Sequence, residues 1–118
     1  MSNKRHWCRV KVDLPAQARP LVSGRDMSVR IVDINSRGVC FSGLTSFEPG
    51  NKIDITLEVR EFPLLVIRTE VVWSGFVAKE KHYHTGVQLV DTPAEVCESF
   101  LRCYSFFLLK SGQKKDIL

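Results

Sequence analysis

Apolar and polar residues alternate along much of the chain up to residue 91, which is typical of β-strands with one buried face. The strictest alternation, over residues 53–59, follows a turn at Pro49-Gly50-Asn51. The first strand is expected to stop at Pro15, because proline lacks the N–H that a sheet needs. Strands at such short spacing favour a small antiparallel barrel or sandwich. The predicted strands are 10–14, 29–31, 39–41, 53–59, 65–77 and 86–90.

The spacing changes near residue 92 and predicts one C-terminal helix over about 92–111. Thr92 is expected to cap it, with Pro93 in the first turn and Glu95 closing a capping box. A stripe of apolar residues then recurs at helical spacing and should pack on the barrel, with Gly112 as the stop. Residues 113–118 are expected to be a disordered tail. The stripe consists of Val96, Phe100, Cys103, Tyr104, Phe107 and Leu108.

The length of 118 residues leaves room for one core but not for a second catalytic domain. The longest apolar stretches hold four to five residues, and a bilayer-spanning helix needs ~20, so no membrane span is predicted. The N-terminus lacks the apolar region of a signal peptide, which favours a cytoplasmic location. The four cysteines show no CxxC spacing, as expected of free thiols in a reducing compartment.

The net charge of +4 comes from one short segment, because 17 Lys and Arg stand against 13 Asp and Glu. The first eleven residues hold Lys4, Arg5, Arg9 and Lys11 and no acid, whereas bases and acids balance in the rest of the chain. Residues 1–12 are therefore predicted to form a flexible basic arm or a local anion site.

Two short segments carry candidate chemistry. Arg5 and Arg9 form an RxxxR pair whose planar guanidinium groups suit a phosphate or the O6 and N7 edge of guanine, although alone the pair also fits a solvated tail. The segment Asp33 to Gly38 reads DxNxxG, and Asn35 can simply cap a type I turn between two strands. His82 and His84 lie two apart without a third metal ligand nearby, which favours surface residues over a zinc site.

Together, RxxxR before the first strand and DxNxxG between two later strands resemble the PilZ domain family over about residues 4–110. The resemblance implies a mainly β fold over residues 10–112, a six-stranded antiparallel β-barrel with a C-terminal α-helix. It also implies a receptor for cyclic di-GMP, without cofactor, metal or enzymatic reaction. The family usually has serine where this chain has Asn35, which keeps a short polar side chain and adds hydrogen-bond donors.

The resemblance also assigns roles to individual residues. Lys4, Arg5 and Arg9 would bind the two phosphates and the guanine edges of cyclic di-GMP. Asp33 and Asn35 would bind the ligand from the turn, with Asp33 accepting from the N1 and N2 hydrogens of guanine. Gly38 would leave room for a flat ligand to approach the backbone. Trp73 either stacks on a guanine or belongs to the core.

Three hypotheses follow. The first is a bacterial, cytoplasmic cyclic di-GMP receptor, monomeric or weakly dimeric, whose N-terminal arm orders on binding and signals to an unidentified protein in motility, pili, biofilm or virulence control. The second is a PilZ-like protein-interaction module that does not bind cyclic di-GMP. The third, a nucleic-acid-binding barrel, ranks last because charge is balanced beyond the arm.

Overall fold

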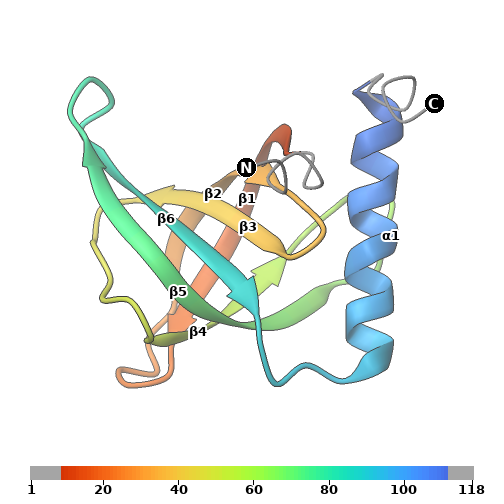
Figure 1. Cartoon of the computed structure of the whole chain (residues 1–118), viewed down its shortest axis with the longest axis horizontal. Helices are drawn as coiled ribbons and strands as arrows, with labels where there is room; N and C mark the ends of the chain where they lie inside the picture. Colours follow the sequence, from red (N-terminus) through yellow and green to blue (C-terminus); the bar gives the residue numbers. More distant parts are fainter. Residues whose placement is uncertain (1–8, 112–118) are drawn as a thin grey trace, which may run out of the picture.

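The computed structural model describes residues 9–111, which form a closed barrel of six antiparallel strands followed by one helix (Figure 1). The strand order around the barrel is β1-β2-β3-β6-β5-β4. The predicted fold class is thus confirmed. The elements are β1 (Val10–Pro20), β2 (Met27–Ile34), β3 (Gly38–Gly43), β4 (Lys52–Leu57), β5 (Leu65–Val77), β6 (His82–Leu89) and α1 (Ala94–Lys110).

Alternating apolar residues fill the barrel as the sequence pattern predicted. Isoleucines 31, 53, 55 and 67 are all 0% exposed, and Phe41 is 1% exposed. Two threonines are also fully buried, and both have hydrogen-bond partners. Thr69 Oγ1 donates to the Ile53 carbonyl at 2.7 Å, and Thr85 Oγ1 lies 2.9 Å from Ser74 Oγ. The interior is therefore apolar with its polar exceptions satisfied.

The prediction that the first strand stops at Pro15 is wrong, because β1 continues to Pro20. Pro15 is paired with Arg30 of β2, and pairing with β4 begins only at Ala16. Its missing N–H therefore costs no hydrogen bond on the β4 side, which is where a strand tolerates proline.

Helix α1 stands beside the barrel and packs against β5 and β1 (Figure 1). The predicted apolar stripe is its packing face, with Phe100 and Cys103 buried. The predicted capping box is wrong: Pro93 is the N-cap residue, without a side-chain cap hydrogen bond. The Thr92 hydroxyl instead donates to the carbonyls of Val90 at 2.7 Å and Arg68 at 3.3 Å, which ties the chain before the helix to β5.

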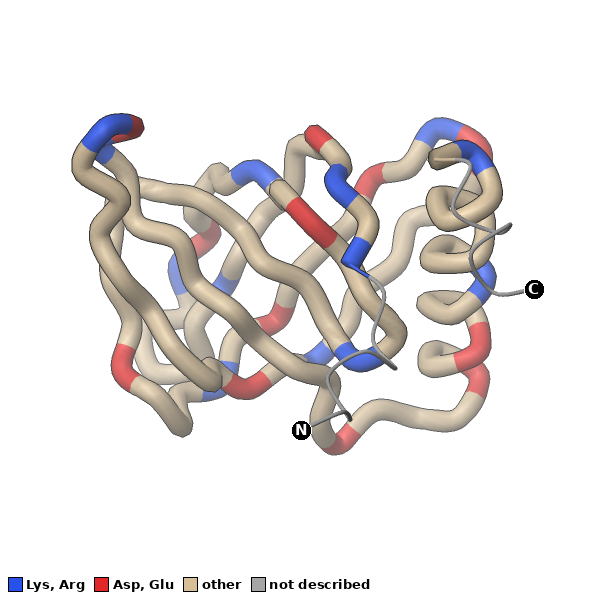
Figure 2. Tube along the Cα trace, turned by 45° about the horizontal axis from the view of Figure 1, so that its top comes forward, with Lys and Arg blue, Asp and Glu red and all other residues tan. Residues whose placement is uncertain are grey.

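Charged residues of both signs are intermixed over the barrel and the helix (Figure 2). The part of the predicted basic arm that is described consists of Arg9 and the first residues of β1. Lys4 and Arg5, Gly112 and the predicted tail lie outside the described residues. Among residues 9–111, no helix is long and apolar enough to span a membrane.

Candidate functional site

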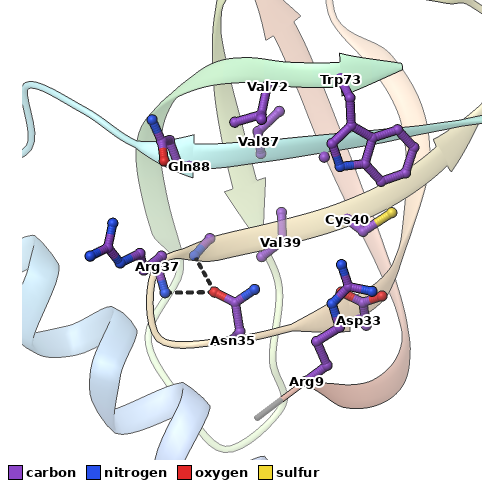
Figure 3. Close-up of a pocket in the computed structure, with 12 residues that line it drawn as sticks. Arg9, Asp33, Asn35, Arg37, Val39, Cys40, Val72, Trp73, Val87 and Gln88 are labelled. Carbon is purple, nitrogen blue, oxygen red and sulfur yellow. Dashed lines mark hydrogen bonds between the residues drawn. The ribbon is translucent and has the colours of Figure 1, made fainter. Parts of the chain in front are cut away.

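Four neighbouring strands bring Asp33 and Trp73 onto one outer wall of the barrel. Asp33 of β2 is paired with Cys40 of β3, Cys40 with Gly86 of β6, and Gly86 with Trp73 of β5. These four residues form one row across the wall. The two small residues in the middle leave a shallow floor between the carboxylate and the indole (Figure 3).

Both ends of this row depend on irregular strand pairing. The register of β2 against β3 shifts between Ile31 and Asp33, and that of β5 against β6 shifts between Val71 and Trp73. A bulge of this kind turns the following side chain to the other face of the sheet. Ile31 and Val71 point into the core, and Asp33 and Trp73 therefore face outward. Since Trp73 is 41% exposed, the alternative of a core tryptophan is ruled out.

The indole of Trp73 lies directly over Gly86. A Cβ atom at Gly86 would overlap Nε1 of the indole and would lie 2.7 Å from its Cε2. Any side chain at this position would displace the ring. The absence of a side chain at Gly86 therefore allows the Trp73 indole to pack against the β6 backbone.

The turn between β2 and β3 is shaped by Asn35, as the turn interpretation of the sequence predicted. Its Oδ1 accepts hydrogen bonds from the backbone N–H groups of Arg37 at 2.7 Å and Gly38 at 3.0 Å (Figure 3). The backbone N–H of Asn35 donates to the Gly38 carbonyl at 3.0 Å. The acceptor of the side chain is therefore used inside the turn, while the amide nitrogen points to the side of Arg9 and Asp33.

The neighbouring strand β6 requires a glycine at position 38. A Cβ atom here would overlap the Val87 carbonyl oxygen and would lie 2.8 Å from the Gln88 Cα. The Leu89 N–H also donates to the Arg37 carbonyl at 2.9 Å. The turn is thus fixed tightly against β6, and the expected role of Gly38 in leaving room for a flat ligand stays a prediction.

The electrostatics of the row are set by partial burial. Burial raises the pKa of the Asp33 carboxyl above its usual range, although the positive charges of Arg9 and Lys11 and the nearby His84 act to lower it. In Figure 3 the guanidinium of Arg9 lies beside this carboxylate. Burial, with a contribution from Asp33, also raises the pKa of the Cys40 thiol to about 12. Cys40 is therefore a neutral thiol near pH 7 and a poor nucleophile.

The predicted site residues among those described meet at one pocket of about 180 Å³. Arg9, Asp33, Asn35, Gly38 and Trp73 all line it. The pocket joins the end of the RxxxR segment, the DxNxxG turn and the indole, which are far apart in the sequence. Lys4 and Arg5 lie outside the described residues.

Other residues of the pocket were not predicted as site residues. They are Arg37, Val39, Cys40, Val72, Gly86, Val87 and Gln88. Gly86 had a usable signal, because a glycine inside a strand often marks a close approach of another group. Gln88 and Val72 carried no such signal, since they face the pocket only through the pairing of β6 with β3 and the bulge in β5.

The two histidines of β6 bind Glu80 in the turn before the strand. His82 Nδ1 lies 2.8 Å from the Glu80 carbonyl oxygen, and His84 Nε2 lies 2.8 Å from Glu80 Oε1. Within the described part of the chain, no group of three or more His, Cys, Asp or Glu side chains is placed to hold a metal ion.

The described residues thus form a closed six-stranded barrel with a pocket on its outer wall. The PilZ domain family model matches residues 2–107, and the chain therefore belongs to the PilZ domain family. No curated protein sequence matches it significantly.

Solved structures support the same fold at low sequence identity. The inhibitor of motility MotI/DgrA of Bacillus subtilis is 14% identical with a TM-score of 0.75, over 93% of this chain and 52% of that one. The MrkH–c-di-GMP complex of K. pneumonia is 15% identical with a TM-score of 0.78, over 93% and 55%. The PilZ domain of Escherichia coli YcgR with c-di-GMP is 11% identical with a TM-score of 0.70, over 98% and 100%. The chain spans about half the length of MotI and MrkH.

Proposed function

We propose that this protein is a receptor for cyclic di-GMP. PilZ domains bind cyclic di-GMP as a ligand and are not a catalytic family, and the similar MrkH and YcgR structures are complexes with this molecule. The observation that carries the proposal is the meeting of Arg9, Asp33 and Trp73 at one pocket. We propose no enzymatic reaction.

The pocket residues offer complementary groups to a guanine nucleotide. The guanidinium of Arg9 is suited to the O6 and N7 edge of guanine or to a phosphate. The Asp33 carboxylate is an acceptor for the N1 and N2 hydrogens on the other edge. The exposed face of Trp73 offers a stacking surface, which is worth about 1–3 kcal/mol per base in other complexes. The Asn35 amide nitrogen adds a donor.

We propose that the described residues make only part of the site, and the small size of the pocket supports this. Drug-sized ligands occupy pockets of roughly 300–1,000 Å³, whereas this pocket measures about 180 Å³. We propose that Lys4 and Arg5 complete the site from the other side of the ligand. Binding would then change the conformation of the N-terminal arm, because two phosphates neutralise its like charges.

The signal would pass to a protein partner that recognises the changed arm, in the bacterial cytoplasm, with the receptor as a monomer or weak dimer. Motility, pili, biofilm and virulence control are the processes proposed.

One observation favours the alternative of a PilZ-like interaction module that does not bind the ligand. The Asn35 acceptor is already used by two backbone N–H groups of its own turn. The alternative predicts no binding of cyclic di-GMP under any condition.

Calorimetric titration with cyclic di-GMP tests the proposal. We expect saturable binding by the wild-type chain, with one or two ligands per protein. Arg5→Ala and Arg9→Ala should each weaken it at least about ten-fold, because each removes a bidentate guanidinium contact. The thermal transition should be nearly unchanged in both, since Arg9 is exposed and precedes the barrel.

The matched control is Arg60→Ala, which removes an exposed arginine from the turn after β4 and should bind like wild type. Amide exchange over residues 1–12 gives a second readout and should slow when the ligand is added. Absence of binding by the wild type would contradict the receptor function. Binding with unchanged exchange would contradict only the response of the arm.

A further inference from the structure

Asp33 differs from the other aspartates among residues 9–111, because it alone forms no ion pair with a lysine or arginine. In each of the other four, a basic nitrogen lies between 2.6 and 3.0 Å from a carboxylate oxygen. These pairs are Asp13 with Arg30, Asp26 with Arg19, Asp54 with Arg68, and Asp91 with Lys52. The aspartate without a pair is thus the one that lines the candidate pocket.

The groups around Asp33 attract its charge without pairing with it. Arg9 before β1, Lys11 of β1 and His84 of β6 all favour the ionised form. The neighbouring group on β3 is the Cys40 thiol, which stays neutral because its pKa is raised to about 12. Burial outweighs the three attractions and raises the pKa of the Asp33 carboxyl. The free protein therefore holds this carboxyl closer to protonation than an ordinary aspartate.

Guanine recognition at this pocket calls for the ionised carboxylate. The N1 and N2 groups of guanine both carry hydrogens, and an ionised carboxylate offers an acceptor oxygen to each of them. A protonated carboxyl carries an O–H on one of its two oxygens and loses that match. Hydrogen bonds donated to a carboxylate stabilise its charged form. A bound guanine would therefore hold Asp33 ionised at a pH where the free protein is partly protonated.

We propose that binding of cyclic di-GMP is coupled to the loss of a proton from Asp33, so that the affinity falls in acid. The O–H bond of the neutral carboxyl breaks, the proton passes to solvent, and the carboxylate accepts the N1 and N2 hydrogens of guanine. This inference rests on the proposed receptor function and adds a pH dependence to it.

The sign of the effect follows from the two states of the carboxyl. The affinity is full above the raised pKa of the free protein and falls as pH drops through it. The fall reaches about ten-fold per pH unit, until the carboxyl of the bound complex also takes up a proton. Asp54 would not respond in this way, because Arg68 lowers its pKa. Acidification would thus release the ligand at constant ligand concentration.

Calorimetric titration of the full chain with cyclic di-GMP tests the coupling. We expect binding to be roughly ten-fold weaker at about pH 4.5 than at about pH 7.5, at constant ionic strength. At the acidic pH, two buffers of different ionisation enthalpy should give different heats, because the buffer takes up the released proton. Thermal unfolding should show that the protein is folded under both conditions.

Three variants identify the group that releases the proton. Asp33→Asn should bind at least about ten-fold more weakly than wild type near neutral pH, since a hydrogen bond to a charged group is lost. Its remaining affinity should be the same at both pH values. The matched control Asp54→Asn changes a paired aspartate on another wall and should keep the affinity and pH dependence of the wild type. His84→Gln removes the neighbouring histidine and should also keep the pH dependence.

The outcomes separate the coupling from the receptor function. If the folded wild type binds equally well at both pH values, the coupling is overturned and the receptor function stands. The coupling is also overturned if pH dependence is lost in His84→Gln and kept in Asp33→Asn. If Asp33→Asn binds too weakly to measure, the dependence of the wild-type heat on the buffer decides. Absence of wild-type binding near neutral pH would contradict the receptor function itself.

Discussion

Two walls of the barrel each carry an outward-facing aspartate, and the carboxyl pKa is shifted in opposite directions on the two walls. On the wall of β4 and the first half of β5, Arg68 closes on Asp54 with contacts of 2.7 and 3.0 Å. This hydrogen bond lowers the pKa of Asp54. On the pocket wall, burial raises the pKa of Asp33. Among residues 9–111, no arginine makes a comparable two-contact pair with Asp33.

The backbone differs in the same way. The pairing of β4 with β5 runs from Lys52 to Leu57 without a register shift. The pocket wall contains two shifts, at Asp33 and at Trp73, and two glycines whose Cβ positions are already occupied. The regular wall pairs its aspartate with an arginine of the neighbouring strand. The irregular wall holds Asp33 partly buried beside an exposed indole.

The largest effect on this comparison should come from Gly38→Ala. The added methyl would overlap the β6 backbone, which cannot move away as a flexible side chain would. We expect a loss of about 3 kcal/mol in the free energy of unfolding, measured by urea denaturation. Gly75→Ala is the control, because nothing lies within 4 Å of its Cβ position, and it should leave stability nearly unchanged. If Gly38→Ala and Gly75→Ala lost the same free energy of unfolding, overlap with β6 would not be the cause of the loss at Gly38.

A smaller effect is expected from Asp33→Asn. Because folding raises the pKa of Asp33, the stability that its neutral form carries is present at low pH and is lost as pH rises through the raised pKa. Asn remains neutral, so near pH 7 the variant should be more stable than wild type, by at most about 1 kcal/mol. The difference should disappear below the ordinary aspartate pKa of about 4. Thermal unfolding as a function of pH measures it, and a destabilised variant at neutral pH would contradict the expected desolvation.

The smallest effect, of opposite sign, is expected from Asp54→Asn. Here folding lowers the pKa, so the stabilisation is present above the unfolded-state pKa and is lost as pH falls through the folded-state value. The variant should be slightly less stable than wild type near pH 7 and equal to it in strong acid. Because the pair with Arg68 is partly exposed, salt should reduce the difference. The same pH series measures this difference. A gain in stability of Asp54→Asn at neutral pH would contradict the lowered pKa of Asp54.

Much of the fold could be predicted from alternation, because burial on one face of a strand imposes a period of two. The pattern predicted where the strands lie along the chain and which face of the helix packs on the barrel. It failed at Pro15, where the permitted position of a proline depends on which strand lies beside it. It also failed at Thr92, whose hydroxyl bonds to a carbonyl of β5 that is distant in sequence.

The candidate site was predictable only as a set of residues. The motif spacing selected Arg9, Asp33 and Asn35, all of which line the pocket. It could not decide the position of Trp73, because a bulge at Val72 turns the indole outward and leaves no mark in the alternation. The contact between Trp73 and Gly86 was not predicted for a related reason, since it depends on the pairing of β5 with β6.

The position of Trp73 over Gly86 has a practical consequence. The protein has two tryptophans, Trp7 and Trp73, so a Trp7→Phe chain retains a single fluorophore in the wall of the pocket. Its emission responds to the polarity of its surroundings, which a stacked base or a change in the charge of Asp33 would alter. The Trp7→Phe chain thus provides an optical reporter of the proposed nucleotide pocket without an added label.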